Sequence, residues 1–197
     1  MLLEQTRDLL PGQSRVVLET DRLVLRVPTL ADVKAIAMLA NDRRIAENTR
    51  CLPHPYTLAD AETFVASVQG RVMQDTFLIT QDGETPVGIC GLDWRSDTPD
   101  IGYWLGTRYW RQGLGTEAAR ALLDHAFAAY DIQSVLAGAR VTNPASRRLL
   151  EKCGFQWTGV ELHRIRALGS STPVDRFRLD RRIWASLKNW RSARRVA

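Results

Sequence analysis

A strand that runs through a glycine-containing loop into a long helix constrains this sequence more than any other segment. Residues Asp100–Gly106 (DIGYWLG) are rich in the residue types that strands favour. Gly113 and Gly115 follow shortly afterwards, and Thr116–Tyr130 places apolar side chains on one face at helical spacing. A strand joined to an amphipathic helix by a short loop is a unit of folds that mix strands and helices. The chain therefore needs a sheet for this helix to cover.

The segments on either side of this unit predict the rest of the sheet. Asp82-Gly83 is typical of a hairpin turn, Thr29 can cap the first helix, and Thr57 or Asp60 the second. The order of elements predicts an α/β (α+β) fold with one mixed, mostly antiparallel sheet and one strand–helix–strand crossover. The predicted strands are Arg22–Val27, Thr76–Thr80, Pro86–Trp94, Asp100–Gly106, Ser134–Val141, Val160–Ile165 and Val174–Leu179. The first predicted helix carries Val33, Ile36, Ala37 and Ala40 at helical spacing, and the others are Leu58–Val68, Thr116–Tyr130 and Pro144–Lys152. We predict a single domain over residues 1–197, with a core of about 19–180 and an N-terminal extension over 1–18.

The positive charge of the sequence is concentrated at its C-terminal end. The formal net charge is +5, from 27 basic and 22 acidic residues. Residues 181–197 hold six of the basic residues and none of the acidic ones, which leaves a body of net charge −1. Such a tail is either a solubilising end to a last helix or an anchor for an acidic partner. A nearly neutral body is not expected to bind nucleic acid specifically.

The cysteines, histidines and apolar runs predict a reduced cytoplasmic protein that lacks a structural metal. Cys51, Cys90 and Cys153 are odd in number and far apart, and the three histidines do not fall at metal-ligand spacing. The apolar runs are too short for a membrane span or a secretion signal. We therefore expect no membrane partner.

The loop that holds Gly113 and Gly115 predicts an anion site. Glycines at the start of a helix let the backbone approach a ligand, and the N–H groups there point outward at the positive end of the helix dipole. No lysine adjoins the glycines, which excludes the Walker pattern, and Ala118 occupies the third glycine position of the dinucleotide fingerprint. A pyrophosphate bound outside these two motifs is the prediction.

Several motifs follow one another along the chain: Thr20–Arg26, Pro55-Tyr56-Thr57 with Asp60-Ala61, Ile101–Gly106, Tyr109–Ala118, Asn143–Ser146 and Leu150–Phe155. In this order they resemble the GNAT N-acetyltransferases, most closely the branch that acetylates the N-termini of ribosomal proteins (the RimJ/RimL type). The resemblance spans roughly residues 19–179. The sequence departs from the family at Trp110, where the phosphate signature usually begins with Gln or Arg, a substitution common in this branch. It departs again at Leu150, where many members carry a tyrosine.

The resemblance implies a binding site for acetyl-CoA, which acts as co-substrate, with no metal. It implies that the strand before the loop separates from its neighbour and binds the pantetheine arm through its backbone. It implies that the loop binds the pyrophosphate through the N–H groups of Gln112 to Thr116, with a charge contact from Arg111. The implied cofactor-binding residues are Tyr103, Trp104, Leu105, Arg111, Gln112, Gly113, Leu114, Gly115, Thr116 and Asn143. For Tyr103 and Trp104 the alternative is an aromatic pair on opposite faces of a buried strand, which we prefer for Trp104, and for Asn143 a helix cap.

The catalytic residues follow from what acetyl transfer to an amine requires. Because Leu150 removes the family's tyrosine, Ser146 becomes the candidate to hydrogen-bond the leaving thiolate. Asp100 is the candidate base, with Asp93 and Glu161 acting through water, or His54, as alternatives. Cys153 lies on the apolar face of its helix, so we expect a buried thiol and direct transfer without an acyl-enzyme.

The acceptor is predicted from the branch and from the free energy of deprotonating an amine. At pH 7 deprotonation costs about 1 kcal/mol for an α-amine and roughly 4–5 kcal/mol for a lysine side chain. A peptide or protein N-terminal α-amine is therefore favoured over a small amine such as an amino acid, a polyamine or an antibiotic. The loops Asn41–Tyr56 and Ala167–Pro173 are expected to line the acceptor cleft. A non-catalytic acyl-CoA sensor is the other class, and a homodimer is left open.

Overall fold

The computed structural model describes residues 17–70, 75–94 and 96–196. Its strands are β1 Leu18–Glu19, β2 Leu23–Arg26, β3 Thr76–Gln81, β4 Thr85–Asp93, β5 Asp100–Leu105, β6 Ser134–Arg140, β7 Gln156–Ile165 and β8 Ser170–Asp180. Its α-helices are α1 Val33–Ala40, α2 Arg43–Ala46, α3 Leu58–Gln69, α4 Leu114–Ala129, α5 Pro144–Lys152 and α6 Arg181–Val196. Short 3-10 turns lie at η1 Leu30–Asp32, η2 Thr107–Tyr109 and η3 Arg166–Leu168. The predicted mixed α/β fold is confirmed.

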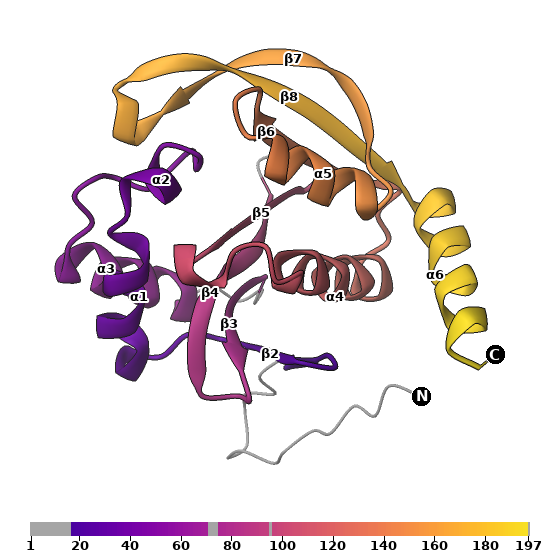
Figure 1. The fold of residues 1–197 in the computed structure, drawn as a ribbon, viewed down its shortest axis with the longest axis horizontal. Helices are drawn as coiled ribbons and strands as arrows, with labels where there is room; N and C mark the ends of the chain where they lie inside the picture. The colour runs from indigo at the N-terminus through magenta and orange to yellow at the C-terminus, as the bar shows by residue number, and fades with distance from the viewer. Residues whose placement is uncertain (1–16, 71–74, 95, 197) are drawn as a thin grey trace.

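The sheet has eight strands in the order β1-β2-β3-β4-β5-β6-β8-β7. All neighbours are antiparallel except β5 and β6, which are the strands joined by the α4 crossover. Helices α1 and α3 lie on one face and α4 on the other (Figure 1). Alternate residues of β3 divide between the two cores, because Leu78 packs with α1 and α3 while Phe77 and Ile79 pack with α4.

Local signals in the sequence explain how several of these elements begin and turn. Thr57 caps α3, where its Oγ1 accepts a hydrogen bond from the Asp60 N–H at 3.2 Å and the Asp60 carboxylate accepts one from the Thr57 N–H at 2.9 Å. Asp82 and Gly83 both have positive φ, as a tight hairpin turn requires. Thr29 caps the 3-10 turn η1, which leads directly into α1.

Two predicted loops are wrong in part. Residues 170–173 belong to β8, so the turn between the last two strands is confined to η3 and Gly169, whose φ of 63° favours glycine. The register between β6 and β8 ends at Arg140 opposite Val174, so the N–H that Pro173 lacks is not needed for that ladder. The Pro173 carbonyl still accepts a hydrogen bond from the Val141 N–H at 3.3 Å. The loop Asn41–Tyr56 contains α2, which is capped by the Asp42 side chain. The long helix α4 also begins at Leu114, before the predicted Thr116.

The C-terminal basic segment forms α6, which packs against the body. The Trp184 ring stacks on Phe127 with centroids 4.8 Å apart, and its indole N–H donates to the Asp124 carboxylate at 2.7 Å. Arg181, the first residue of α6, donates to the backbone carbonyls of Phe127, Tyr130 and Ile132. The start of the tail is therefore held by α4 and the segment that follows it.

Candidate functional site

The loop before α4 exposes backbone N–H groups at the start of that helix. Gly113 is the helix cap with a φ of 80°, and Arg111 has a φ of 62°. The N–H groups of Leu114 and Gly115 lie in the first turn, where the helix offers them no acceptor. The N–H of Thr116 donates to the Gly113 carbonyl at 3.1 Å. Of the N–H groups predicted to bind an anion over Gln112 to Thr116, that of Thr116 is therefore already paired within the helix.

Two residues outside the predicted site fix this loop. The Arg22 guanidinium donates to the Gln112 carbonyl at 3.0 Å and pairs with Glu117 at 2.6 Å. The Thr20 hydroxyl donates to the same Glu117 carboxylate at 2.7 Å. Burial opposes ionisation of Glu117, but the hydrogen bonds from Thr20 and Arg22 lower the pKa of its carboxyl overall. The turn between β1 and β2 therefore ties the loop to the edge of the sheet.

Strand β5 separates from β6 directly before this loop. The two strands pair at Asp100 with Leu136 and at Ile101 with Ala137, and there the ladder ends. The Leu136 N–H donates to the Pro99 carbonyl, and on the other side the Gly106 N–H donates to Val87. Because backbone groups alternate between the two neighbouring strands, those of residues 101, 103 and 105 face β6. The backbone of Tyr103 therefore faces the gap between the strands, as the resemblance implied.

Trp110 occupies one of the acceptors at this open edge. Its indole N–H donates to the Leu105 carbonyl at 2.8 Å, and the Arg44 guanidinium lies 5.7 Å from the centre of its ring. The N–H and carbonyl of Tyr103 and the N–H of Leu105 remain directed at the gap. The substitution at position 110 thus removes one carbonyl from those that a pantetheine arm would meet.

The aromatic pair of β5 lies on opposite faces of the sheet. Trp104 packs against the core formed with α1 and α3, whereas Tyr103 packs against the core formed with α4. The Trp104 side chain is therefore part of the core, as preferred above. The Leu105 side chain packs close to Gly115, because a Cβ on Gly115 would lie 3.4 Å from Leu105 Cδ1. Gly115 thus allows α4 to approach the end of β5 closely.

Asn143, Ser146 and Tyr103 meet across the gap. Asn143 caps α5, and its Oδ1 accepts a hydrogen bond from the Ser146 N–H at 3.1 Å. The Ser146 hydroxyl lies 2.9 Å from the Tyr103 hydroxyl. Desolvation by burial raises the pKa of Tyr103. The first turn of α5 and the open part of β5 are therefore joined by a pair of hydroxyl groups.

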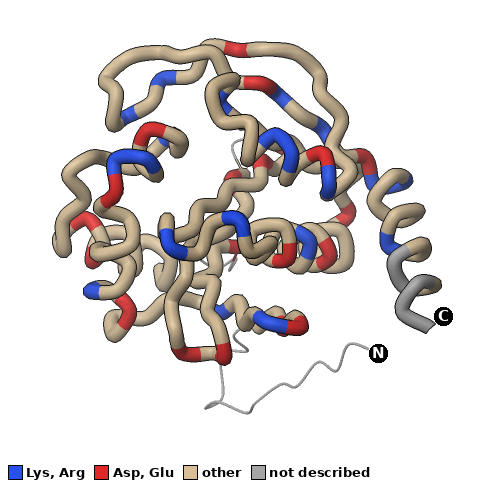
Figure 2. The backbone as a smooth tube through the Cα atoms, viewed as in Figure 1, with Lys and Arg blue, Asp and Glu red and all other residues tan. Residues whose placement is uncertain are grey.

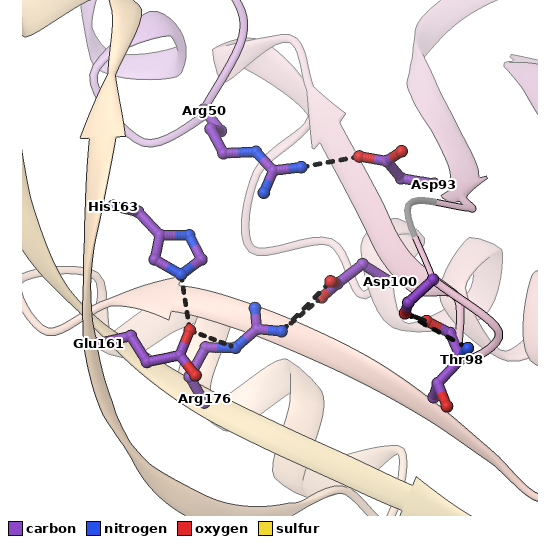
Figure 3. A network of polar contacts seen from close by, with 8 residues as sticks. Arg50, Asp93, Thr98, Asp100, Glu161, His163 and Arg176 are labelled. Carbon is purple, nitrogen blue, oxygen red and sulfur yellow. Dashed lines mark hydrogen bonds and ion pairs between the residues drawn. The ribbon is translucent and has the colours of Figure 1, made fainter.

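Two of the candidate bases, Asp100 and Glu161, belong to one network of charged side chains (Figure 3). Asp100 accepts two hydrogen bonds from Arg176 Nη2, at 3.0 and 3.2 Å. Arg176 Nε lies 3.4 Å from Glu161, which also contacts His163 at 2.8 Å. The hydrogen bond from His163, with smaller contributions from the charges of Arg176 and His163, lowers the pKa of Glu161 against the opposing effect of burial. The network joins β5, β7 and β8.

Small residues and a second ion pair complete this side of the site. A Cβ on Gly138 would lie 3.0 Å from Arg176 Nη1, so a glycine in β6 leaves room for the guanidinium. Arg50 pairs with Asp93 at 2.7 Å, and the Arg50 carbonyl accepts a hydrogen bond from the Arg166 N–H at 3.1 Å. That last bond links the loop after α2 to the turn between β7 and β8. Of the four candidate bases, Asp93 therefore lies in this separate pair, and His54 lies on an exposed loop.

Leu150 and Cys153 are buried in the α4 core, with exposed fractions of 0% and 4%. The expected buried thiol at Cys153 is confirmed. Figure 2 shows basic residues on α2, on α5 and in the loop before α4. Several of them are paired with carboxylates, as Arg43 is with Glu47 and Arg147 with Asp175, whereas Arg111 in the loop is exposed.

The described residues also bear on membranes and metals. None of the helices within them is long and apolar enough to cross a membrane. The same residues contain no cluster of His, Cys, Asp or Glu that could hold a metal ion.

Comparison with known proteins gives a consistent family. The Acetyltransferase (GNAT) domain matches residues 22–156. The uncharacterized N-acetyltransferase YoaA of Bacillus subtilis is 31% identical over 152 residues, which cover 73% of this chain and 85% of YoaA. The ribosomal-protein-serine acetyltransferase of Escherichia coli is 27% identical over 110 residues, 51% of this chain and 61% of that protein.

A solved structure shows the same fold with ligands bound. Spermidine N-acetyltransferase from Vibrio cholerae, in complex with CoA and spermine, has a TM-score of 0.71 at 18% identity. The aligned region covers 84% of this chain and 99% of the Vibrio cholerae chain. At this identity the likeness concerns the fold alone, so the acceptor of this chain has to be argued from its own residues.

Proposed function

Because this chain belongs to the GNAT acetyltransferase family and is an N-acetyltransferase, we propose that it acetylates the α-amine of a peptide or protein N-terminus by direct attack within a ternary complex. The observation that carries the proposal is the separation of β5 from β6 after Ile101, directly before the Gly113 loop. A thioester arm and a pyrophosphate require such an edge and such a loop side by side.

The loop and the open edge are proposed to bind acetyl-CoA, the acetyl-donating substrate. The N–H groups of Gln112 to Gly115 hold the pyrophosphate at the helix N-terminus, supported by Arg111. The backbone of Tyr103 pairs with the pantetheine arm, and the Leu105 N–H faces the same gap. A backbone N–H directed at the thioester oxygen stabilises the negative charge that develops there during attack.

The acceptor side supports an α-amine because its carboxylates are already paired with cations. Asp93 is bound by Arg50, and Asp100 and Glu161 are bound by Arg176. A polyamine requires carboxylates that are not neutralised in this way. An α-amine is also neutral at modest cost near pH 7, so a carboxylate acting through water, with Asp100 as the leading candidate, suffices as base.

A panel of acceptors tests the proposal through the release of CoA thiol. The panel contains peptides with free N-termini, the same peptides with blocked N-termini and one internal lysine, spermidine, and free amino acids. We expect turnover with the free N-termini and little with the blocked peptides. Turnover of spermidine or amino acids with none on any peptide would overturn the peptide acceptor while leaving the enzyme class intact.

The wider assignments also stay proposals. We propose one acetyltransferase domain in which α6 is part of the packed body, acting in the cytoplasm where newly made protein N-termini occur. The proposed chemistry does not require the basic residues that follow Arg181 in α6. It does not require a homodimer either.

A further inference from the structure

We propose that the Tyr103 hydroxyl positions the Ser146 hydroxyl as the hydrogen-bond donor to the sulfur that leaves during acetyl transfer. The inference rests on the proposed function and adds a positioning residue to it. Its basis is the contact of 2.9 Å between the two hydroxyl oxygens at the gap between β5 and β6.

The helix that faces the gap offers few groups to the sulfur. Leu150 is fully buried in the α4 core, and Cys153 beside it is buried as well. Ser146 lies in the first turn of α5, which Asn143 fixes through the hydrogen bond from the Ser146 N–H. The helix backbone is therefore anchored, and the Ser146 hydroxyl is left to be oriented by its own partner.

The direction of the hydrogen bond decides what Ser146 can do. A serine hydroxyl has one proton and two acceptor positions, and a tyrosine hydroxyl has one proton. When Tyr103 donates to Ser146, the Ser146 proton is available for another acceptor. Burial raises the pKa of Tyr103, so its phenol keeps its proton and can donate it to Ser146.

The backbone and the side chain of Tyr103 then both act on the acetyl-CoA thioester. Its backbone lies at the open edge that we propose for the pantetheine arm, and its side chain reaches the first turn of α5. The sulfur of a thioester follows directly on that arm. One residue of β5 therefore sets the position of the arm and the orientation of the donor to its terminal atom.

The chemical step balances without ionisation of the phenol. The amine nitrogen forms a bond to the acetyl carbon, the carbon–sulfur bond breaks, and its electron pair goes to sulfur. The Ser146 hydroxyl donates a hydrogen bond to this developing thiolate. The proton that the nitrogen releases passes to the base and solvent, and the thiolate is protonated from solvent. Tyr103 acts through Ser146 and does not touch the reacting atoms.

The direct test is the acidity of the thiol in bound CoA, followed through the ultraviolet absorbance of the thiolate during a pH titration. A correctly oriented hydroxyl stabilises the thiolate, so the wild type is expected to show a larger acid dissociation constant for this thiol than Tyr103→Phe, by about tenfold. Ser146→Ala is expected to show the same loss. The double variant should lose no more than either single variant, because Tyr103 acts only through Ser146.

Controls separate positioning from packing. Tyr130→Phe removes another partly buried phenol, one that donates to the buried Asp75 carboxylate away from the gap. It should lower thermal stability without changing the acidity of bound CoA. Ser146→Thr keeps a hydroxyl and should restore most of the effect that Ser146→Ala removes.

Kinetics on whichever amine is turned over provide the second readout. Tyr103→Phe is expected to lower kcat about tenfold with the KM for acetyl-CoA within about twofold of wild type. The inference is overturned when Tyr103→Phe leaves the acidity of bound CoA unchanged, or when its effect multiplies with that of Ser146→Ala. Failure of the proposed acceptor is a different result, because the titration of bound CoA involves no acceptor.

Discussion

The two sides of the site, proposed for acetyl-CoA and for the acceptor, are formed by different kinds of groups. The side proposed for acetyl-CoA consists mostly of backbone groups from one continuous segment, from β5 through the Gly113 loop to the first turn of α4. The side proposed for the acceptor consists of charged side chains from β4, β5, β7, β8 and the loop after α2, which form two sets of ion pairs (Figure 3). On these proposals, binding of the donor depends on local conformation, whereas binding of the acceptor depends on pairing between distant strands.

This difference means that the two sides can be perturbed separately. A change in the loop acts on donor affinity, and a change in the ion-pair network acts on the acceptor. The following predictions test this separation in order of decreasing effect.

The largest effect is expected from Gly113→Glu. A side chain at a φ of 80° is strained, and a carboxylate at the helix N-terminus would occupy and repel the proposed anion site. Calorimetric titration with CoA should show at least about a hundredfold loss of affinity by these two effects. Gly83→Glu is the matched control, because it imposes the same strain at a φ of 79° in a distant hairpin. Equal loss of affinity in both variants would show that backbone strain destabilises the protein in general and that the proposed anion site is not responsible.

The next effect is expected from Arg176→Gln, which leaves Asp100 and Glu161 without their shared guanidinium. We expect kcat/KM for the acceptor to fall about tenfold, an order typical of losing a partner in a half-buried charged network. CoA affinity should stay within about twofold in the same titration. Arg178→Gln, two residues along β8 and paired with Asp180, is the control. A parallel loss of CoA affinity would argue against separate sides.

The same contrast, between a loop formed by one local segment and ion pairs between distant strands, decides how much of the site could be predicted from the sequence. The Gly113 loop was predicted because its signal is local: a strand, two glycines and a helix in sequence. The pairing of Asp100 with Arg176 could not be predicted, since it depends on β8 lying next to β6 and on the room left by Gly138. Asp100, Asp93 and Glu161 were named as candidates, but their arginine partners were not.

Two other omissions have physical reasons. Helix α2 has four residues, too few to show a helical period, and the Asp42 cap was its main signal. Arg22 and Glu117 were not predicted as a pair, although both lie in motifs that carry the family resemblance. Their separation along the chain gives no local pattern, and the contact exists because α4 crosses the first strands of the sheet.

A smaller effect is expected from Glu117→Gln, which removes the carboxylate that holds Arg22 and Thr20. Because Arg22 is half exposed, we expect a loss of about 1 kcal/mol in the free energy of unfolding at neutral pH. The folded-state pKa of Glu117 lies below its ordinary value of 4.5, so the contribution is present above that value and disappears as pH falls through the lowered one. Urea unfolding of both proteins at neutral and acidic pH should converge at the acidic end. A constant difference would show that the carboxylate charge is not responsible.

The smallest effect on activity is expected from Cys153→Ala. The thiol is buried in the α4 core, so transfer without an acyl-enzyme predicts kcat within about twofold of wild type. Stability should fall by about 1 kcal/mol from the lost packing. Initial-rate kinetics with both substrates varied should give intersecting lines. Parallel lines, or an acetylated cysteine found by mass spectrometry, would contradict direct transfer.

The short junction between β5 and β6 has a consequence for the behaviour of the whole sheet. It divides the eight strands into two antiparallel ribbons, β1 to β5 and β6 with β8 and β7, which share two rungs of parallel pairing. In the proposed complex the pantetheine arm pairs with the backbone of Tyr103 between the two ribbons. A bound co-substrate would then add hydrogen bonds where the strands share few, and the twist between the ribbons would depend on whether the site is occupied.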